Sequence, residues 1–239
     1  MKTSISAIIL KGGKVDEFLY KKCLNSVSFA DEKIIVDTSV QKGNFAEWRN
    51  IGAKEAKSEW LLYVDTDEQI TQELAKIILQ VVGSNEFAGY AIPRRNIFLG
   101  HEMHWGGWYP DYVLRLIKRD KLVGWEGELH EQPKISGEIC HLNEPLLHNS
   151  HRNLTDMVDK TNEWSGLEAK LLYDSRHPKM NIARFFSAGI REFWYRGFVK
   201  MGFLDGIVGV IEIIYQTFSR LITYSKLWEL QLNYARRNL

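Results

Sequence analysis

The stretch WLLYVDTDEQIT, residues 60–71, places acidic side chains directly after an apolar run. Trp60–Val64 has the length and composition typical of a strand buried in a parallel sheet. Asp65, Asp67 and Glu68 follow within four positions. Like charges this close repel one another, and each carboxylate loses hydration if the strand end is enclosed. The stretch therefore predicts a core strand whose end lies beside a positively charged group.

Strands and helices alternate on both sides of this stretch. The patterns predict strand 4–10, helix 15–27, strand 34–36, helix 44–59, strand 60–64 and helix 71–82. Because the links are short, the sheet is predicted to be largely parallel. Ligands of open parallel sheets lie beyond the carboxyl ends of the strands, where Asp37, Asp65 and Asp67 are found.

Composition indicates an ordinary soluble globular protein. The 239 residues are 45% hydrophobic and 26% charged, which suits one large domain or a domain with an appended subdomain. Two cysteines, Cys23 and Cys140, are too few for a disulfide framework, and the N-terminal residues do not resemble a signal peptide. A reducing, cytoplasmic setting is expected.

The pattern changes after residue 87. Between about 88 and 150, short apolar runs alternate with Gly, Pro and Asn turns, which predicts a smaller mixed or antiparallel region. Trp105, Trp108 and Trp125 lie among these runs. Such aromatic side chains suit a site that grips a sugar or a planar ring, and equally suit packing under long loops.

From residue 153 onward the pattern is helical and becomes basic. Residues 176–239 carry 10 Lys+Arg against 4 Asp+Glu, whereas residues 1–175 carry 21 against 26. An apolar stripe recurs at helical steps through residues 182–201, and four cations flank it: Arg184, Arg191, Arg196 and Lys200. This pattern favours contact with a membrane interface over packing on the body or dimerisation.

Two other partners or placements are disfavoured for this segment. Asp205, Glu212 and Arg220 interrupt the apolar run at 202–224, so a membrane-spanning helix is not expected. The segment has no Lys/Arg-rich run and no recognisable nucleic-acid module, so no nucleic-acid partner is expected.

The acids of the opening stretch have a chemical interpretation. Asp65 and Asp67, one residue apart at a strand end, can hold a divalent metal through oxygen ligands. Such a metal neutralises a bound diphosphate, so Mg²⁺ or Mn²⁺ is the expected positive charge. Alternatively, the acids only help to cap the next helix.

Six stretches, taken in order, resemble family 2 glycosyltransferases, and the closest branch resembles lipopolysaccharide core glucosyltransferases. They are FADEKIIVDTS, RNIGAKEAKSEWLLYVDTDEQIT, YAIPRRNIFLG, GGWYPDYVLRLIKRD, LHEQP and GFLDGIVGV with YSKLWELQ. The resemblance covers nearly the whole chain. It implies a nucleotide-sugar donor, a divalent metal and inversion at the anomeric carbon.

The same resemblance implies the fold class and its boundaries. We expect an α/β GT-A fold, Rossmann-like with a mainly parallel sheet, a small mixed β subregion and a C-terminal amphipathic helical segment. Residues 1–152 would form the glycosyltransferase domain, with a nucleotide-binding half (1–87) and an acceptor-side half (88–152). Residues 153–239 would form a helical, basic extension that associates with a membrane.

Donor-side residues follow from the matched motifs. Asp37 matches an acid that contacts the nucleotide base or ribose. Arg49 and Asn50 match a pair close to the nucleotide, although Asn50 could equally serve helix packing. Asp65 and Asp67 match the metal-binding acids of the family's DxD motif, with Asp67 the expected direct ligand.

Transfer-side residues follow in the same way. Asp111, Arg115 and the adjacent His130 and Glu131 match motifs that face the transfer site. Inverting transfer needs a carboxylate that takes the proton of the acceptor hydroxyl. Glu131 is favoured for this role over Asp111.

Three further side chains stay open between a binding role and a structural one. Arg94 and Arg95 are candidates for phosphate contacts, or else form a solvated pair. His148 matches a position where some GT-A enzymes carry an additional metal ligand, although a lone loop histidine is more often structural.

The chain departs from the family in its nucleotide-binding half. DTSVQKGNFAEWRN, residues 37–50, is shorter than the corresponding family segment. One strand–helix unit is therefore expected to be missing there, which bears on how the nucleotide base is held.

The expected function is a metal-dependent inverting glycosyltransferase that uses a UDP-sugar. It would act on a lipid-linked or cell-envelope glycan, as a peripheral protein at the inner face of the cell membrane. An inactive relative that binds glycan or scaffolds a membrane assembly is the main alternative. A metal-dependent phosphohydrolase would share the same carboxylates.

Overall fold

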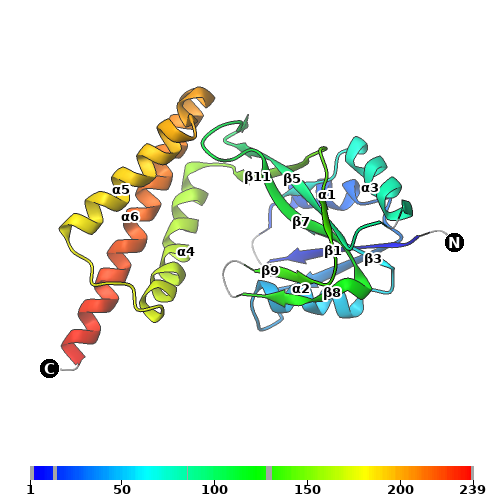
Figure 1. Cartoon of the computed structure of the whole chain (residues 1–239), viewed down its shortest axis with the longest axis horizontal. Helices are drawn as coiled ribbons and strands as arrows, with labels where there is room; N and C mark the ends of the chain where they lie inside the picture. The colour runs from blue at the N-terminus through cyan, green and yellow to red at the C-terminus, as the bar shows by residue number, and fades with distance from the viewer. Residues whose placement is uncertain (1–2, 13–14, 85, 128–130, 238–239) are drawn as a thin grey trace. The chain divides into compact units, whose positions relative to one another are not determined.

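The computed structural model describes residues 3–12, 15–84, 86–127 and 131–237 (Figure 1). The chain divides into two compact units. The first comprises Met1–Asn96 and Pro110–Ser150, and the second comprises Ile97–Tyr109 and His151–Leu239. We call them the first unit and the helical unit.

Three parallel strands begin the sheet of the first unit. Their order is β2 (Glu32–Asp37), β1 (Ile5–Lys11) and β3 (Trp60–Asp65). In register, Lys11 lies opposite Asp37 and Leu10 lies opposite Asp65. The carboxyl ends of the three strands therefore meet at one edge of the sheet, as the alternating pattern predicted.

The remaining strands join this core in a mixed arrangement. They are β4 (Glu68–Gln69), β5 (Gly89–Phe98), β6 (His101–Glu102), β7 (Asp111–Lys118), β8 (Leu122–Glu126), β9 (Gln132–Ile135), β10 (Ile139–His141) and β11 (Leu146–His151). β7 pairs antiparallel with β3 and with β5, while β8 and β9 form a separate two-stranded sheet. β11 pairs antiparallel with β4 and places His148 opposite Glu68. This is the predicted mixed region.

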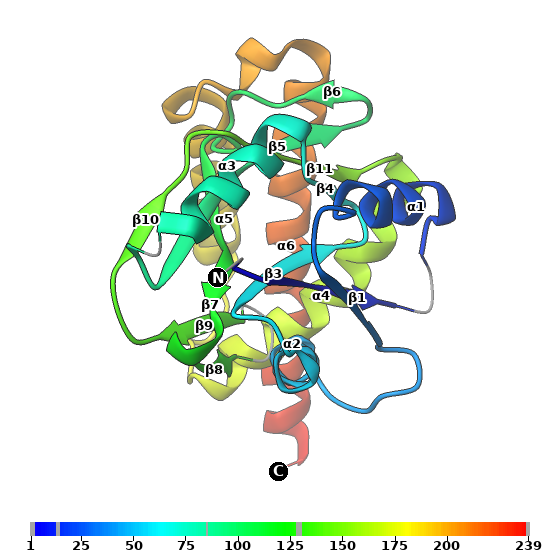
Figure 2. The ribbon, with the colours of Figure 1, turned by 90° about the vertical axis from the view of Figure 1, so that its right-hand side faces the viewer.

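Helices cover both faces of the parallel strands. α1 (Glu17–Ser26) and α3 (Gln72–Ser84) lie on one face and α2 (Phe45–Glu55) on the other (Figure 2). Successive side chains of a strand point to opposite faces, so Ile9 packs toward α1 and α3 while Ile8 packs toward α2. Together these elements confirm the predicted α/β, Rossmann-like fold class.

The connection from β2 to α2 is short. A turn follows Asp37, and α2 begins after Asn44, whose side chain accepts the backbone N–H of Glu47 while the Glu47 carboxylate accepts the N–H of Asn44. This reciprocal capping box starts the helix directly. Residues 38–44 contain neither strand nor helix, which confirms that the expected strand–helix unit is missing.

The helical unit consists mainly of three long helices. They are α4 (Leu154–Asp174), α5 (Ile182–Trp194) and α6 (Gly206–Arg237), with a π-helical turn η2 (Tyr195–Val199) and a 3₁₀ turn η3 (Gly202–Asp205) between the last two. α6 packs against both α4 and α5. Within the described chain, Gly202–Asn233 alone is long and apolar enough to cross a membrane, judged by length and composition.

Because α2 packs closely on the sheet, we expect Gly52→Ala to destabilise the protein although alanine favours a helix. A Cβ at Gly52 would lie 2.4 Å from Ile8 Cγ2, whereas a Cβ at Gly83 on α3 meets nothing within 4 Å. Both changes to alanine improve helix propensity by up to about 1 kcal/mol. Overpacking at position 52 costs about 1–3 kcal/mol. Urea denaturation should show Gly52→Ala as destabilised and Gly83→Ala as neutral or more stable; equal midpoints would contradict this packing.

Candidate functional site

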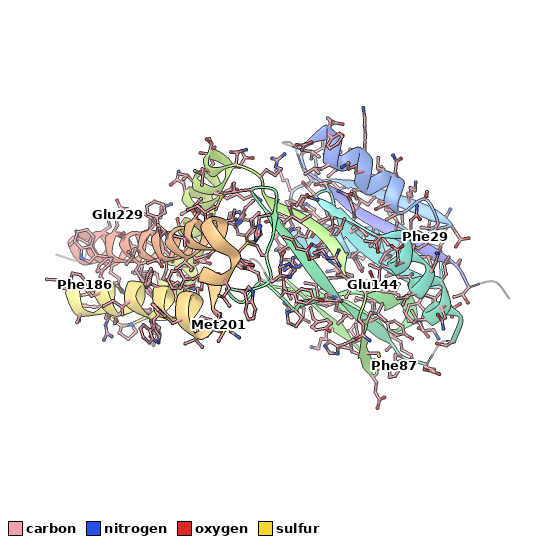
Figure 3. The ribbon with its side chains drawn as sticks, turned by 90° about the horizontal axis from the view of Figure 1, so that it is seen from above. Phe29, Phe87, Glu144, Phe186, Met201 and Glu229 are labelled. Carbon is pink, nitrogen blue, oxygen red and sulfur yellow. The ribbon has the colours of Figure 1, made fainter. Side chains whose placement is uncertain are left out.

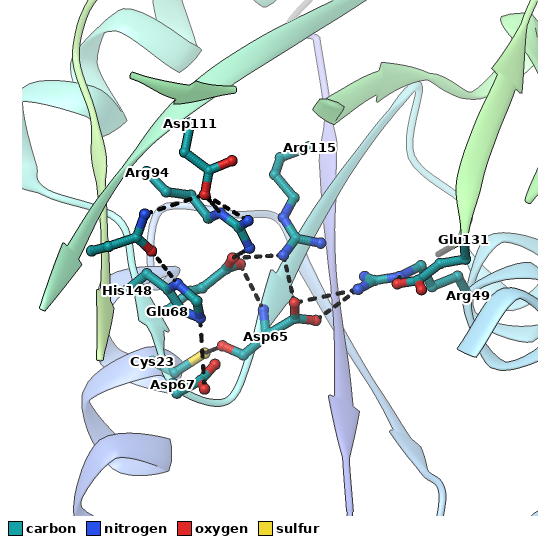
Figure 4. Close-up of polar contacts among 11 residues, drawn as sticks. Cys23, Arg49, Asp65, Asp67, Glu68, Arg94, Asp111, Arg115, Glu131 and His148 are labelled. Carbon is teal, nitrogen blue, oxygen red and sulfur yellow. Dashed lines mark hydrogen bonds and ion pairs between the residues drawn. The ribbon is translucent and has the colours of Figure 1, made fainter. Parts of the chain in front are cut away.

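The Asp65 carboxylate, at the carboxyl end of β3, lies between two arginines (Figure 4). Arg49 Nη2 donates to Asp65 Oδ1 at 3.0 Å, and Arg115 Nη2 donates to Oδ2 at 2.5 Å. Arg49 comes from α2 and Arg115 from β7, and both side chains are buried. The positive charge predicted beside this strand end is thus supplied by the chain itself.

Glu68 completes the buried charge cluster. Its carboxylate is fully buried, and Oε1 accepts Arg115 Nη2 at 2.6 Å. Its other oxygen accepts the backbone N–H of Asp65 at 3.0 Å. Glu68 was not among the predicted site residues, and its position beside the DxD acids was the one signal that could have indicated it. The Arg115 guanidinium therefore bridges two carboxylates, which fixes its position, and Arg115 and Arg49 together balance the two negative charges.

The ionisation of Asp65 reflects this arrangement. Burial alone would raise the pKa of its carboxyl group, but the nearby guanidinium groups of Arg115 and Arg49 hold that pKa well below its usual range. The pKa of Arg115 is raised in return, since both carboxylates favour its charged form over the cost of burial. Asp65 is therefore an anion whose oxygens are both committed to arginines.

Arg49 links this cluster to the predicted base. Its Nε donates to Glu131 Oε1 at 3.2 Å, and its guanidinium carbon lies 4.8 Å from the ring centre of Trp125. Asn50 holds the backbone of Trp125 with two hydrogen bonds, of 3.0 Å and 2.9 Å. Asn50 therefore bonds to the backbone of β8, and the Trp125 ring lies against the Arg49 guanidinium.

A second chain of contacts runs from Asp111 to Asp67. Arg94 Nη2 lies 2.7 Å from Asp111 Oδ2, and Asn96 Nδ2 donates to the same oxygen at 3.2 Å. Because the Asn96 amide nitrogen faces Asp111, its carbonyl oxygen faces His148 Nδ1, 2.7 Å away. His148 Nε2 lies 3.8 Å from Asp67 Oδ2.

This chain fixes the tautomer of His148. With the Asn96 oxygen as acceptor, Nδ1 carries the proton and Nε2 presents its lone pair toward Asp67. Burial lowers the pKa of His148, against the opposing pull of Asp67, so the ring favours the neutral form. Two electron-rich atoms thus face each other, which suits a cation between them.

Of the three predicted metal ligands, Asp67 and His148 are therefore better placed to bind an ion than Asp65. Asp67 and His148 have the right atoms and spacing for two ligands of one ion, whereas both Asp65 oxygens accept arginine hydrogen bonds. Among the residues the structure describes, no group of three or more His, Cys, Asp or Glu side chains is placed to hold a metal. A bound phosphate would have to supply further oxygens.

A cavity of about 290 Å³ adjoins the cluster. Its wall includes Glu131, Arg49 and Asp65, together with Arg94, Arg115 and Trp125. Asp111 is not part of this wall, although it pairs with Arg94. The cavity is therefore polar and is bordered by the favoured base.

Two predicted residues, Asp37 and Arg95, lie apart from the cluster, and a third falls outside the residues that the structure describes. Asp37 is exposed at the end of β2, where bonds from the Ser39 hydroxyl and N–H hold the pKa of its carboxyl group below the usual value. Arg95 alternates with Arg94 along β5, so its side chain points to the opposite face. His130 lies outside the described residues. Arg94, then, is the member of the arginine pair that reaches the site.

The chain resembles proteins named as glycosyltransferases. It matches no protein-family profile. It is 24% identical to an uncharacterized glycosyltransferase of Rickettsia bellii, over 95% of this chain and 87% of that protein. It is 25% identical to another of Rickettsia typhi, over 97% of this chain and 89% of that one. These relatives confirm the predicted enzyme class, a glycosyltransferase.

The solved structures that resemble the chain include TarS of S. aureus. TarS 1–349 in complex with UDP-GlcNAc aligns with a TM-score of 0.42 and 12% identity, over 98% of this chain and 92% of that one. A longer TarS structure aligns with a TM-score of 0.42 and 14% identity, and the chain spans 46% of its length.

Removal of Arg115 should strongly destabilise the first unit. Arg115→Met removes the cation nearest to the buried Glu68 and leaves only Arg94, 4.0 Å away, which costs about 3–5 kcal/mol of unfolding free energy. The double variant Arg115→Met/Glu68→Gln removes the uncompensated charge and should recover part of this loss. Urea denaturation of both variants tests the bridge; equal stability of wild type and Arg115→Met would contradict it.

The two cysteines should differ sharply in reactivity. Burial raises the pKa of Cys23, which lies beneath the site and donates to the Asp65 carbonyl, to about 12. At pH 8 roughly one Cys23 in ten thousand is then a thiolate, the reactive form. Alkylation of native protein, mapped by mass spectrometry, should modify the partly exposed Cys140 first and Cys23 only after denaturation. Equal rates would contradict this placement.

Proposed function

We propose that this chain transfers a sugar, with inversion, from a UDP-sugar to a lipid-linked or cell-envelope glycan. The observation that carries the proposal is that the acids at one sheet edge have different partners. Asp65 and Glu68 are neutralised by arginines, Asp67 faces the His148 lone pair, and Glu131 borders the adjoining cavity.

Asp67 and His148 form the donor side in this proposal. They would hold Mg²⁺ or Mn²⁺, which when bound neutralises the donor diphosphate and assists its departure. Asn96 holds His148 in the tautomer that such a role requires. Arg94, 24% exposed on its side chain and lining the cavity, is placed to approach a phosphate oxygen.

Glu131 is the proposed base on the acceptor side. It takes the proton of an acceptor hydroxyl while that oxygen attacks the anomeric carbon, and the diphosphate leaves with the electrons of the broken C–O bond. Arg49 orients the Glu131 carboxylate through Oε1. Asp111 is the weaker candidate, because its Oδ2 is held by Arg94 and Asn96.

The finer assignments rest on the sequence motifs. Membership of the lipopolysaccharide core branch and action at the inner face of the membrane are parts of the proposal that the motifs support. An inactive relative would bind a glycan or a membrane without releasing UDP. A phosphohydrolase would release phosphate from a simple ester and need no acceptor.

Calorimetric titration tests the donor site first. UDP and UDP-GlcNAc are suitable first ligands because they are present in the TarS structures. Binding should require Mn²⁺ and should be lost in Asp67→Asn, since that change removes the charged metal ligand. The matched control Asp120→Asn, in the turn between β7 and β8, should bind like wild type. Metal-independent binding, or binding that Asp67→Asn leaves intact, would contradict the assignment of Asp67.

Substitution of the base separates chemistry from binding. Glu131→Gln should lower the rate of acceptor-dependent UDP release by about 10²–10⁴-fold, because a positioned base contributes that much. Its affinity for UDP with Mn²⁺ should stay near that of wild type. If Asp111→Asn rather than Glu131→Gln gives this result, the base is Asp111.

A further inference from the structure

The helical unit exposes an apolar stripe along α5. Ile182, Phe186 and Ile190 are 77%, 66% and 64% exposed, and the helical period places them on one face together with Trp194. Phe186 and, farther along the chain, Met201 lie at the outer surface of this unit in Figure 3. A soluble monomer seldom leaves such a continuous apolar row in water.

The connection from α5 to α6 continues this surface. Phe198, Val199, Met201, Leu204 and Ile207 are all more than one-third exposed. Met201 and Gly206 have positive φ angles of 53° and 66°, so the chain turns sharply here. The turn brings these apolar side chains to the end of the α5 stripe.

A groove of about 410 Å³ separates α5 from α6. Its α5 wall is formed by Phe185, Phe186, Gly189, Ile190, Phe193 and Trp194, and its α6 wall by Thr217 and Leu221. A Cβ at Gly189 would lie 3.2 Å from Leu221, so this glycine permits the close approach of the two helices. Apart from the Thr217 hydroxyl and the Trp194 indole N–H, the lining side chains are hydrocarbon.

Cations border the apolar stripe. The helical period places Arg184 and Arg191 beside it, on the side of α5 away from the groove, and Lys200 is exposed at the end of η2. Glu192 is the one acid in residues 182–200, and it pairs with Arg196 at 2.7 Å and Arg220 at 3.6 Å. The surface is therefore apolar at its centre and positively charged at its border.

We propose that this surface docks on an anionic lipid bilayer, with the groove receiving a lipid hydrocarbon chain. An apolar helix face bordered by cations gains both from burial among acyl chains and from attraction to anionic headgroups. A second copy of the chain is disfavoured, because a two-fold contact through the same face would oppose like cations. The proposal concerns lipid binding alone and is independent of the sugar-transfer activity.

Polar contacts of η3 and α6 within the helical unit favour docking over spanning. Asp205 accepts the backbone N–H groups of His104 and Trp105 at 3.1 Å and 2.8 Å. Farther along, Tyr215 donates to the Met157 carbonyl and Thr223 to Glu168. One face of α6 is thus held by polar bonds within the unit, and a spanning helix would have to give these up in hydrocarbon.

Flotation with vesicles tests the proposal on the full chain. The protein should float with vesicles of equal parts phosphatidylcholine and phosphatidylglycerol, and much less with phosphatidylcholine alone. Arg184→Gln/Arg191→Gln should weaken binding about thirtyfold, from about 1 kcal/mol per cation. Phe186→Ser/Ile190→Ser should abolish it, since the buried apolar area is lost.

Two variants of the first unit serve as matched controls for flotation. Lys42→Gln/Lys54→Gln removes two exposed cations of the first unit, and Val40→Ser removes an exposed apolar side chain there; both should float like wild type. Thermal unfolding monitored by circular dichroism checks that each variant is folded. No flotation with anionic vesicles, or equal flotation of all folded variants, would overturn the proposal. A dimer in light scattering without vesicle binding would assign the surface to a second copy instead.

Discussion

The rest of the site depends on the Arg115 guanidinium, which lies buried between Asp65 and Glu68. Two carboxylates at the end of a core strand would otherwise repel each other and lose hydration without compensation. One cation that bonds to both removes that penalty and fixes the backbone, since Glu68 also accepts the Asp65 N–H. The acidic strand end is stable because an arginine from the antiparallel strand β7 bonds to the carboxylates of both Asp65 and Glu68.

The acids of this strand end differ in their partners. Arg49 adds a second cation on Asp65, so Asp65 serves as a positioning anion and Asp67 is the acid that faces His148. The same Arg49 extends to Glu131, so the orientation of the proposed base is connected to the strand end. In the proposed function, one network of charged side chains would thus connect the donor side with the acceptor side.

The helical unit distributes its polar and apolar side chains differently. Polar side chains of η3 and α6 are directed inward, where Asp205, Tyr215 and Thr223 bond within the unit. Its large apolar side chains are directed outward along α5 and the following turn. The apolar cluster that the helical unit buries around Ala169, Met180 and Leu227 is small, whereas apolar residues fill both faces of the sheet in the first unit. The lipid docking that we propose would account for these outward apolar side chains.

Local patterns in the sequence determined the strands that end in Asp37 and Asp65, the helices between them, the missing strand–helix unit and the basic amphipathic segment. These features depend on residues a few positions apart. The sequence did not determine that Glu68 is buried, that Arg94 rather than Arg95 reaches the site, or that Arg49 and Arg115 both bond to Asp65. Those outcomes depend on pairs such as Arg115 and Glu68, which are 47 positions apart. Only the tertiary structure decided them, because it is the pairing of β7, β3 and β5 that brings these charges within hydrogen-bonding distance.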